Sequence, residues 1–250
     1  MNIYVSVIYD DELELVRQNN MGYEITFYSS AKNLDTFETI HPIITQNMKG
    51  INKFSMHGSY DGVNYATNDP LIVEITKKRF MQSINVASFH GVKQLIFHSA
   101  YRTFFGFKEP ATKYFIKTSI AFWADIAKNI PDGMTIFIEN VEDEDPQVFV
   151  EIINGIDSPK IKCCFDIGHA FSYSPFSLDI WIKVLKDKIG YVHIHDNDGK
   201  SDLHLPLGKG NISFLETLYG IMEYTGDKIP FTLECNVPTS IDWLRKNNFL

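Results

Sequence analysis

The 250-residue sequence is poor in the features that mark several large classes of protein. It has only three cysteines, two of them adjacent, which excludes a disulfide framework and favours a reducing compartment. No apolar run reaches the ~18 residues typical of a membrane-spanning helix. Lys and Arg are outnumbered by Asp and Glu, 23 against 31, and the formal net charge of −8 disfavours nonspecific binding to nucleic acid or anionic membranes.

The rest of the composition is typical of a soluble globular protein. Hydrophobic residues make up 44% of the chain and charged residues 22%, which is enough to bury one large core. No linker rich in Pro, Gly or Ser divides the chain, so we expect one domain over residues 1–250. The first residues carry no basic segment and turn acidic by Asp10, so we expect no signal peptide and a cytoplasmic protein.

Short β-branched or aromatic runs alternate with longer segments of helical periodicity. The helical pattern is clearest at 71–87, 111–128 and 212–224. The expected strands are 3–8, 23–28, 53–56, 94–97, 135–138, 162–165, 191–194 and 230–233. Eight strand–helix pairs in this length predict a (β/α)8 TIM barrel.

A doubly wound open sheet is the competing architecture. Such a sheet usually has a Gly-rich phosphate loop after its first strand, and Ile8-Tyr9-Asp10-Asp11 contains no glycine. We therefore predict the closed barrel, whose active site lies at the carboxyl ends of the strands.

Residues of the types that bind metal ions stand at or just beyond the ends of the expected strands. Asp202 and His204, two residues apart, follow in the loop after 191–194 and would share one side of an extended segment. The strand-end residues are His57, His98, Glu139, Asp166, His169, His193 and Glu234.

Taken singly, each of these residues has a simpler structural explanation. A histidine at a strand end is more often a hydrogen-bonded structural residue than a ligand. In a barrel, however, all of them meet at one rim, where unpaired carboxylates would cost several kcal/mol each to desolvate. Shared divalent cations would remove that cost.

Several motifs resemble the xylose-isomerase-like TIM-barrel superfamily, which includes sugar isomerases, sugar epimerases and endonuclease IV. The matching stretches run from the third expected strand to the eighth. They are Met56-His57-Gly58-Ser59-Tyr60, Ile96-Phe97-His98, Ile138-Glu139-Asn140, Phe165-Asp166-Ile167-Gly168-His169-Ala170, His193-Ile194-His195-Asp196, Asp202-Leu203-His204-Leu205-Pro206-Leu207-Gly208-Lys209-Gly210 and Leu233-Glu234.

The resemblance implies different metal sites in its two branches. The sugar epimerases hold one divalent ion on the equivalents of Glu139, Asp166, His193 and Glu234, and the two glutamates also move protons. Endonuclease IV holds three zinc ions on these four residues together with the equivalents of His57, His98, His169, Asp202 and His204. All nine ligand types are present in this sequence.

Charge argues against the nucleic-acid branch. The acidic run 141–145 follows Glu139, where a phosphodiester backbone would have to lie, although it could equally be a solvated helix N-terminus. Four residues are candidates for substrate binding, namely Arg102 in the aromatic loop 99–107, His169, His195 and Lys209. Cys235 follows Glu234 and should point away from the rim.

Three hypotheses follow. We favour a divalent-metal-dependent isomerase or epimerase of a sugar or sugar phosphate, in which Glu139 and Glu234 exchange a proton with substrate carbon. The alternatives are an endonuclease IV-like polynuclear-zinc phosphodiester hydrolase and a non-catalytic barrel that binds metal or ligand. In all three we expect one to three divalent ions, zinc or manganese before others; the sequence does not choose an oligomeric state.

Overall fold

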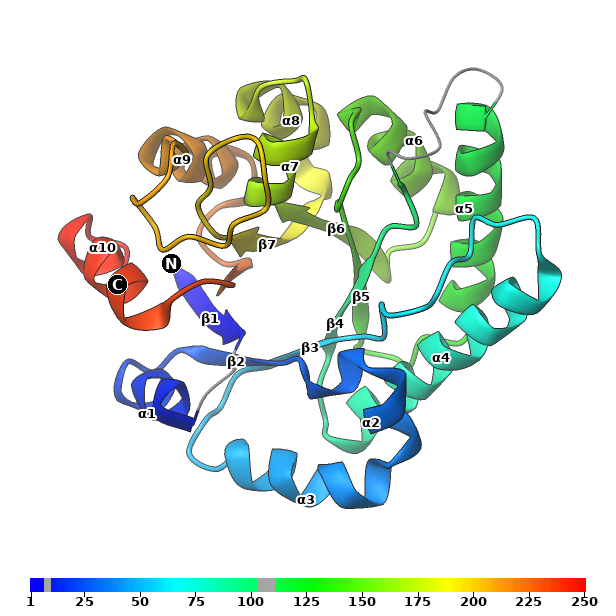
Figure 1. Ribbon diagram of the computed structural model, residues 1–250, viewed down its shortest axis with the longest axis horizontal. Helices are drawn as coiled ribbons and strands as arrows, with labels where there is room; N and C mark the ends of the chain where they lie inside the picture. Colours follow the sequence, from blue (N-terminus) through cyan, green and yellow to red (C-terminus); the bar gives the residue numbers. More distant parts are fainter. Residues whose placement is uncertain (7–9, 103–110) are drawn as a thin grey trace.

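The computed structural model describes residues 1–6, 10–102 and 111–250, and eight strands form one closed barrel in it (Figure 1). Every neighbouring pair is parallel, including the pair formed by the first and last strands, so the predicted (β/α)8 fold is confirmed. The strands are β1 (Asn2–Ser6), β2 (Gly22–Ile25), β3 (Phe54–His57), β4 (Gln94–His98), β5 (Thr135–Glu139), β6 (Ile161–Asp166), β7 (Ile189–Ile194) and β8 (Pro230–Leu233).

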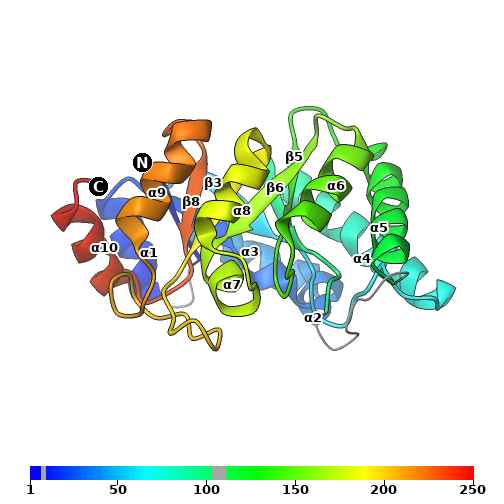
Figure 2. The same ribbon diagram turned by 90° about the horizontal axis from the view of Figure 1, so that it is seen from above.

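Helices surround the barrel, as Figures 1 and 2 show from two directions. Asp69 and Asp145 cap the helices that start at Pro70 and Pro146, because each carboxylate accepts a hydrogen bond from the second helical N–H. The α-helices are α1 (Asp10–Gln18), α2 (Ala31–Asp35), α3 (Phe37–Asn47), α4 (Pro70–Phe89), α5 (Ala111–Ala127), α6 (Pro146–Ile156), α7 (Ile167–Tyr173), α8 (Leu178–Leu185), α9 (Phe214–Thr225) and α10 (Val237–Lys246). Short 3-10 helices are η1 (Phe27–Ser29) and η3 (Lys186–Lys188).

Alternate residues of each strand face the helices or the barrel interior. Phe97 points outward, where its ring stacks on Phe80 at 4.1 Å between centroids, and Phe165 stacks on Trp181 at 5.8 Å. The inward-facing residues form a separate cluster of Ile96, Phe137, Cys164 and Tyr191. Because side chains alternate along a strand, the residue two positions beyond each of these faces the carboxyl-end rim.

The second expected strand is shorter in the structure than its sequence predicts. The run 23–28 was expected to be extended throughout, but β2 ends at Ile25 and Phe27–Ser29 form a 3-10 turn. Residues 7 and 8 of the expected first strand and residues 103–107 of the aromatic loop lie outside the described residues.

The two ends of the chain lie side by side near α1 and α10 in both views (Figures 1 and 2). The amino group of Met1 donates to the carbonyl of Phe249 at 3.2 Å, which helps to close the barrel between its first and last elements. Within the described ranges, none of the helices combines the length and apolar character required to cross a bilayer.

Candidate metal centre at the carboxyl ends of the strands

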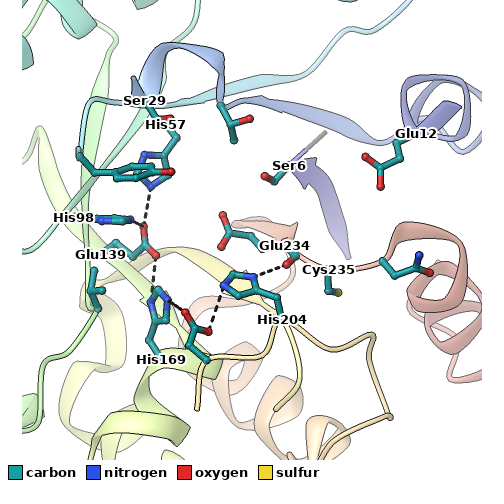
Figure 3. A pocket seen from close by; sticks show the side chains of 15 residues that line it. Ser6, Glu12, Ser29, His57, His98, Glu139, His169, His204, Glu234 and Cys235 are labelled. Carbon is teal, nitrogen blue, oxygen red and sulfur yellow. Dashed lines mark hydrogen bonds and ion pairs between the residues drawn. The ribbon is translucent and has the colours of Figure 1, made fainter. Parts of the chain in front are cut away.

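A cavity of about 700 Å³ opens at the carboxyl ends of the strands. Figure 3 shows His57, His98 and His169 directed at Glu139, with Glu234 facing the same cavity. Each rim ligand lies two residues beyond an inward-facing residue: His98 follows Ile96, Glu139 follows Phe137 and Asp166 follows Cys164. The alternation of the strands therefore brings these side chains to one mouth.

The central group consists of four residues from four strands or strand ends. The ligand atoms of Glu139, Asp166, His193 and Glu234 all lie within 4.8 Å of one another. Nδ1 of His193 lies 3.2 Å from Oε1 of Glu139, 3.4 Å from Oε1 of Glu234 and 3.9 Å from Oδ2 of Asp166. One imidazole nitrogen thus faces three carboxylates across a space of cation size.

A second group shares Glu139 with the first. Nε2 of His57 lies 3.1 Å and Nε2 of His98 lies 3.6 Å from Oε2 of Glu139. The two histidine rings are 4.8 Å apart. Glu139 therefore turns one oxygen to each group, so this carboxylate could serve as a ligand in either group.

A third group lies on the opposite flank, in α7 and the loop after β7. Its members are His169, His195, Asp202 and His204, whose ligand atoms also lie within 4.8 Å of one another. Nε2 of His169 lies 3.3 Å from Oδ2 of Asp202, and Nε2 of His204 lies 3.3 Å from Oδ1 of the same carboxylate. His195 and His204 stack with their rings 3.8 Å apart.

Main-chain carbonyls orient three of these histidines. Nδ1 of His57 donates to Gly58 at 2.9 Å, Nδ1 of His169 to Asn140 at 2.9 Å, and Nδ1 of His204 to Glu234 at 2.6 Å. Each bond places the proton on Nδ1 and leaves the Nε2 lone pair directed into its ligand group, the usual arrangement of a metal-binding histidine.

Hydrogen bonds to the main chain hold Asp166 in place. The Asn140 side chain links β5 to β6: its Nδ2 donates to the carbonyl of Asp166, and its Oδ1 accepts from the Asp166 N–H, both at 2.9 Å. The Asp166 carboxylate in turn accepts from the His169 N–H at 2.7 Å and caps α7. Gly168 is required here, because a Cβ at this position would lie 2.1 Å from Cε1 of His195.

The buried acids and imidazoles shift one another's pKa values. Burial raises the pKa of Glu139, but the imidazoles of His193 and His98 outweigh this and hold it well below its usual value. Burial raises the pKa of Glu234, and neighbouring carboxylates add to the effect despite His193. Burial lowers the pKa of His98 to about 3, which leaves that ring neutral and able to bind a cation.

Several ligand atoms are buried without a hydrogen-bond partner. These orphaned atoms include Oδ2 of Asp166, Nδ1 of His193 and Oδ1 of Asp202. Buried polar atoms are normally satisfied, and all three belong to groups of metal-binding geometry. The donor set of carboxylate oxygens and imidazole nitrogens fits zinc, manganese or cobalt.

All nine residues expected as ligands lie around this one mouth, in the three groups described above. His195, expected as a substrate-binding residue, is fully buried, and its Nε2 lies 3.2 Å from Oδ1 of Asp166. Arg102 pairs with Glu142 at 3.5 Å and Lys209 is exposed; neither is among the residues that line the cavity. Substrate binding by Arg102 and Lys209 stays a prediction.

Sequence reasoning missed Glu24, which is fully buried at the centre of β2. Its signal was an acidic residue between Tyr23 and Ile25 in a run that was expected to be a strand. Two other interpretations need correction. Asp143, in the acidic run 141–145, is buried and accepts from the hydroxyl of Ser99 at 2.7 Å, so it is not part of a solvated helix end. Cys235 lines the cavity instead of pointing away from it.

Comparison with known families and sequences gives two results. A model of the family described as xylose isomerase-like TIM barrel matches residues 30–247. The uncharacterized protein MJ1614 of Methanocaldococcus jannaschii is 30% identical over 168 residues, which cover 65% of this chain and 63% of that protein. The chain thus spans less than two thirds of the length of this relative.

Solved structures with the same fold are available at lower sequence identity. A D-tagatose 3-epimerase-like protein has a TM-score of 0.79 at 22% identity, covering 99% of this chain and 96% of its own. The TTHB071 protein of Thermus thermophilus, soaked with ZnCl2, has a TM-score of 0.78 at 17% identity and covers 98% and 97%. A D-allulose 3-epimerase of Methylomonas sp. in complex with D-allulose has a TM-score of 0.72 at 16% identity and covers 100% and 89%. At these identities the likeness is one of fold.

Proposed function

The chain belongs to the xylose isomerase-like TIM barrel family, and from this premise we propose that it is a divalent-metal-dependent isomerase or epimerase of a sugar or sugar phosphate. The observation that carries the proposal is the central group, in which Glu139 and Glu234 face one cavity beside Asp166 and His193. Structures of the same fold that carry the names of sugar epimerases, one of them with D-allulose bound, support a sugar as substrate.

The two glutamates differ in the way that a proton transfer requires. The low pKa of Glu139 keeps it a carboxylate that can accept a proton from carbon. The pKa of Glu234 is raised by burial, so this carboxyl holds a proton more readily than Glu139 and is the better proton donor of the two. Pairs of carboxyl groups whose surroundings push their pKa values apart are typical of acid–base catalysts.

Asp166, His193 and the two glutamates would hold the divalent cation. When bound, this cation would supply Lewis-acid polarisation of the substrate carbonyl and its neighbouring hydroxyl. The cavity of about 700 Å³ is large enough for a monosaccharide. Among the described residues that line it there is no Lys or Arg, which favours an uncharged sugar over a phosphorylated one.

Deuterium exchange tests the proposal. The cation-loaded protein is incubated in deuterium oxide with D-fructose, D-allulose, D-tagatose and their phosphates, and incorporation into carbon is measured together with the products. The wild type should exchange one carbon-bound proton next to the carbonyl. Glu139→Gln should abolish exchange with the epimer whose proton Glu139 removes, and Glu234→Gln should abolish exchange with the other epimer.

Glu216→Gln is the matched control, because this glutamate is exposed on α9 away from the cavity. Cation content is measured for every variant, since Glu139 and Glu234 are also proposed ligands. Substantial deuterium incorporation from both epimers by Glu139→Gln at full cation occupancy would contradict the assignment.

A second function, polynuclear phosphodiester hydrolysis of the endonuclease IV type, is favoured by one specific observation. One cation needs about four protein ligands, whereas two further groups adjoin the central one. These are His57 with His98, which share Glu139, and the group of four residues that includes Asp202. Bound cations would also offset the repulsion between the acidic rim and a phosphate.

Cation stoichiometry and substrate cleavage separate the two functions. The hydrolase requires about three zinc ions per chain and cleavage of a duplex that contains an abasic site. A protein with one manganese, cobalt or magnesium ion and no cleavage of this duplex at stoichiometric amounts would exclude the second function.

A further inference from the structure

Beneath the central group, four strands contribute to a buried polar cluster. It consists of Glu24 of β2, Ser55 of β3, Tyr191 of β7 and Thr232 of β8, all of them fully buried. No member lines the cavity, so none of them can touch a substrate held there. The cluster is therefore connected to the site only through its neighbours.

One oxygen of Glu24 is fixed by hydroxyl groups. Its Oε2 accepts from Tyr191 at 2.8 Å, from Thr232 at 2.8 Å and from Ser55 at 3.3 Å. The hydroxyls also contact one another, since Oη of Tyr191 lies 2.7 Å from Oγ of Ser55 and 2.6 Å from Oγ1 of Thr232. This side of the carboxylate cannot rotate without breaking contacts to three strands.

The other oxygen of Glu24 faces His193. Oε1 lies 3.3 Å from Nε2 of His193, within ion-pair distance, and within the described residues neither atom makes a hydrogen bond. His193 is fully buried, and its Nδ1 faces the three carboxylates of the central group. The ring thus lies between the barrel interior and the cation site, with one nitrogen on each side.

His193 differs from the other oriented histidines of the site. His57, His169 and His204 donate through Nδ1 to main-chain carbonyls. In the described structure no main-chain carbonyl accepts a hydrogen bond from His193. Its Nε2, the nitrogen away from the cation site, faces the Glu24 carboxylate instead. A carboxylate accepts hydrogen bonds but cannot donate one, so a hydrogen bond between these two atoms requires the proton on Nε2.

We propose that Glu24 is a positioning residue that holds the His193 proton on Nε2 and so directs the Nδ1 lone pair to the cation. The inference rests on the cation site of the proposed function. It adds Glu24, which lies outside that site, as a residue that sets the cation affinity through His193. Partners of this kind fix the ring orientation and protonation of metal-binding histidines, and their loss typically lowers metal affinity by about 10- to 100-fold.

Replacement of Glu24 by Gln makes the inference sharp. The amide oxygen is the natural partner of the three hydroxyls, and the amide NH2 then faces Nε2 of His193. A donor at this position favours the form with the proton on Nδ1, which blocks the lone pair needed by the cation. We therefore expect Glu24→Gln to bind Zn²⁺ or Mn²⁺ about 10- to 100-fold more weakly than the wild type.

Two measurements without substrate test this expectation. Competition with a chromophoric chelator gives the Zn²⁺ affinity, and long-range ¹H–¹⁵N correlation spectra of the Zn²⁺-loaded protein show which nitrogen of His193 carries the proton. The wild type should have the proton on Nε2. Thr232→Val and Ser55→Ala are matched controls, since each removes one hydroxyl from the cluster but keeps Glu24; both should retain the wild-type proton position.

Glu24→Asp covers the case in which Glu24→Gln does not fold. It keeps the charge but is one methylene shorter, so the contact with Nε2 is lost and the Zn²⁺ affinity should also fall. The inference is overturned if Glu24→Gln, or Glu24→Asp in its place, binds Zn²⁺ as tightly as the wild type with the proton still on Nε2. That result would leave the proposed sugar isomerisation or epimerisation intact. A wild type that binds Zn²⁺ as expected but turns over no sugar would overturn the proposed function and leave the role of Glu24 intact.

Discussion

Nε2 of His204 lies 3.3 Å from Oδ1 of Asp202, and both residues line the cavity from the loop after β7. This contact pairs an acid with an imidazole at a position where both could bind one cation. Without a cation, a proton on Nε2 of His204 faces the Asp202 carboxylate instead.

The first prediction concerns the pH dependence of cation binding. Burial lowers the pKa of His204, but its contact with Asp202 outweighs burial and raises the pKa to about 9. Burial also lowers the pKa of His169, but the carboxylate of Asp166 outweighs it and raises the pKa to about 10. Both rings are therefore protonated at pH 7 in the cation-free protein, and a cation must displace the protons. Affinity at this group should rise about tenfold per pH unit for each proton released between pH 7 and pH 9.

Calorimetric titration in buffers of different ionisation enthalpy measures this proton release directly. Binding of Zn²⁺ that releases no protons and has the same affinity at pH 7 and pH 8 would contradict cation binding by His169 and His204.

The second prediction concerns Asp143, whose pKa burial raises from 3.8 to about 6 in spite of its bond from Ser99. Well below its ordinary pKa of 3.8 the carboxyl is neutral in both the folded and the unfolded state, and its contribution to stability is fully present. That contribution is lost as the pH rises towards 6, because the folded protein must then hold a buried charge. The difference corresponds to about 3 kcal/mol.

Asp143→Asn removes this charge and keeps the shape of the side chain. At pH 7 the variant should have a larger free energy of unfolding than the wild type, by up to about 3 kcal/mol, and the two should converge near pH 4. Denaturant unfolding of the cation-free proteins at both pH values measures the difference. A variant that is less stable than the wild type at pH 7 would show that the charged form is needed.

The third prediction separates the central group from its flanks. Asp202→Asn and His98→Gln each weaken one flanking group but leave Glu139, Asp166, His193 and Glu234 unchanged. If the protein is an isomerase, both variants should keep deuterium exchange near the wild-type rate, with Glu216→Gln as the control for the substitution itself. Loss of exchange in both variants, with the central cation still bound, would mean that the flanking groups take part in the chemistry.

The fourth prediction concerns cation removal. A cation that binds only the folded state stabilises it by about 2.7 kcal/mol at a free concentration of 100 times its Kd. At about 2–4 °C per kcal/mol for a chain of this length, this corresponds to a rise in Tm of about 5–11 °C. Chelator treatment should lower Tm by this amount, and added Mn²⁺ or Zn²⁺ should restore it. Glu234→Gln should show a smaller response, and an unchanged response in that variant would argue against Glu234 as a ligand.

The barrel and the meeting of its ligands were predictable because they follow from simple periodicities. Side chains alternate along a strand, so His98, Glu139 and Asp166 at the ends of apolar runs had to reach one rim once the barrel closed. The ends of the runs were less certain. The aromatic run after Ile25 has strand-like composition, but the chain turns at Phe27–Ser29 and the strand stops before it.

What could not be predicted depends on contacts between distant segments. Oε2 of Glu24 is satisfied by residues of β3, β7 and β8, and no local pattern shows that Tyr191 and Thr232 will meet it. Asp143 looks like a solvated acid in sequence, but in the structure it is buried and accepts a hydrogen bond from Ser99, which lies 44 residues earlier in the chain. In both cases the tertiary structure decides whether an acidic residue is exposed or buried.

The central claim is that Glu139, Asp166, His193 and Glu234 share one divalent cation. Anomalous diffraction from crystals loaded with Mn²⁺ or Zn²⁺, collected on both sides of the absorption edge, tests it most directly. We predict a peak bounded by these four side chains, about 2.0–2.2 Å from the nearest carboxylate and imidazole atoms. A fully loaded crystal with its peaks elsewhere, and none within reach of these four residues, would contradict the claim.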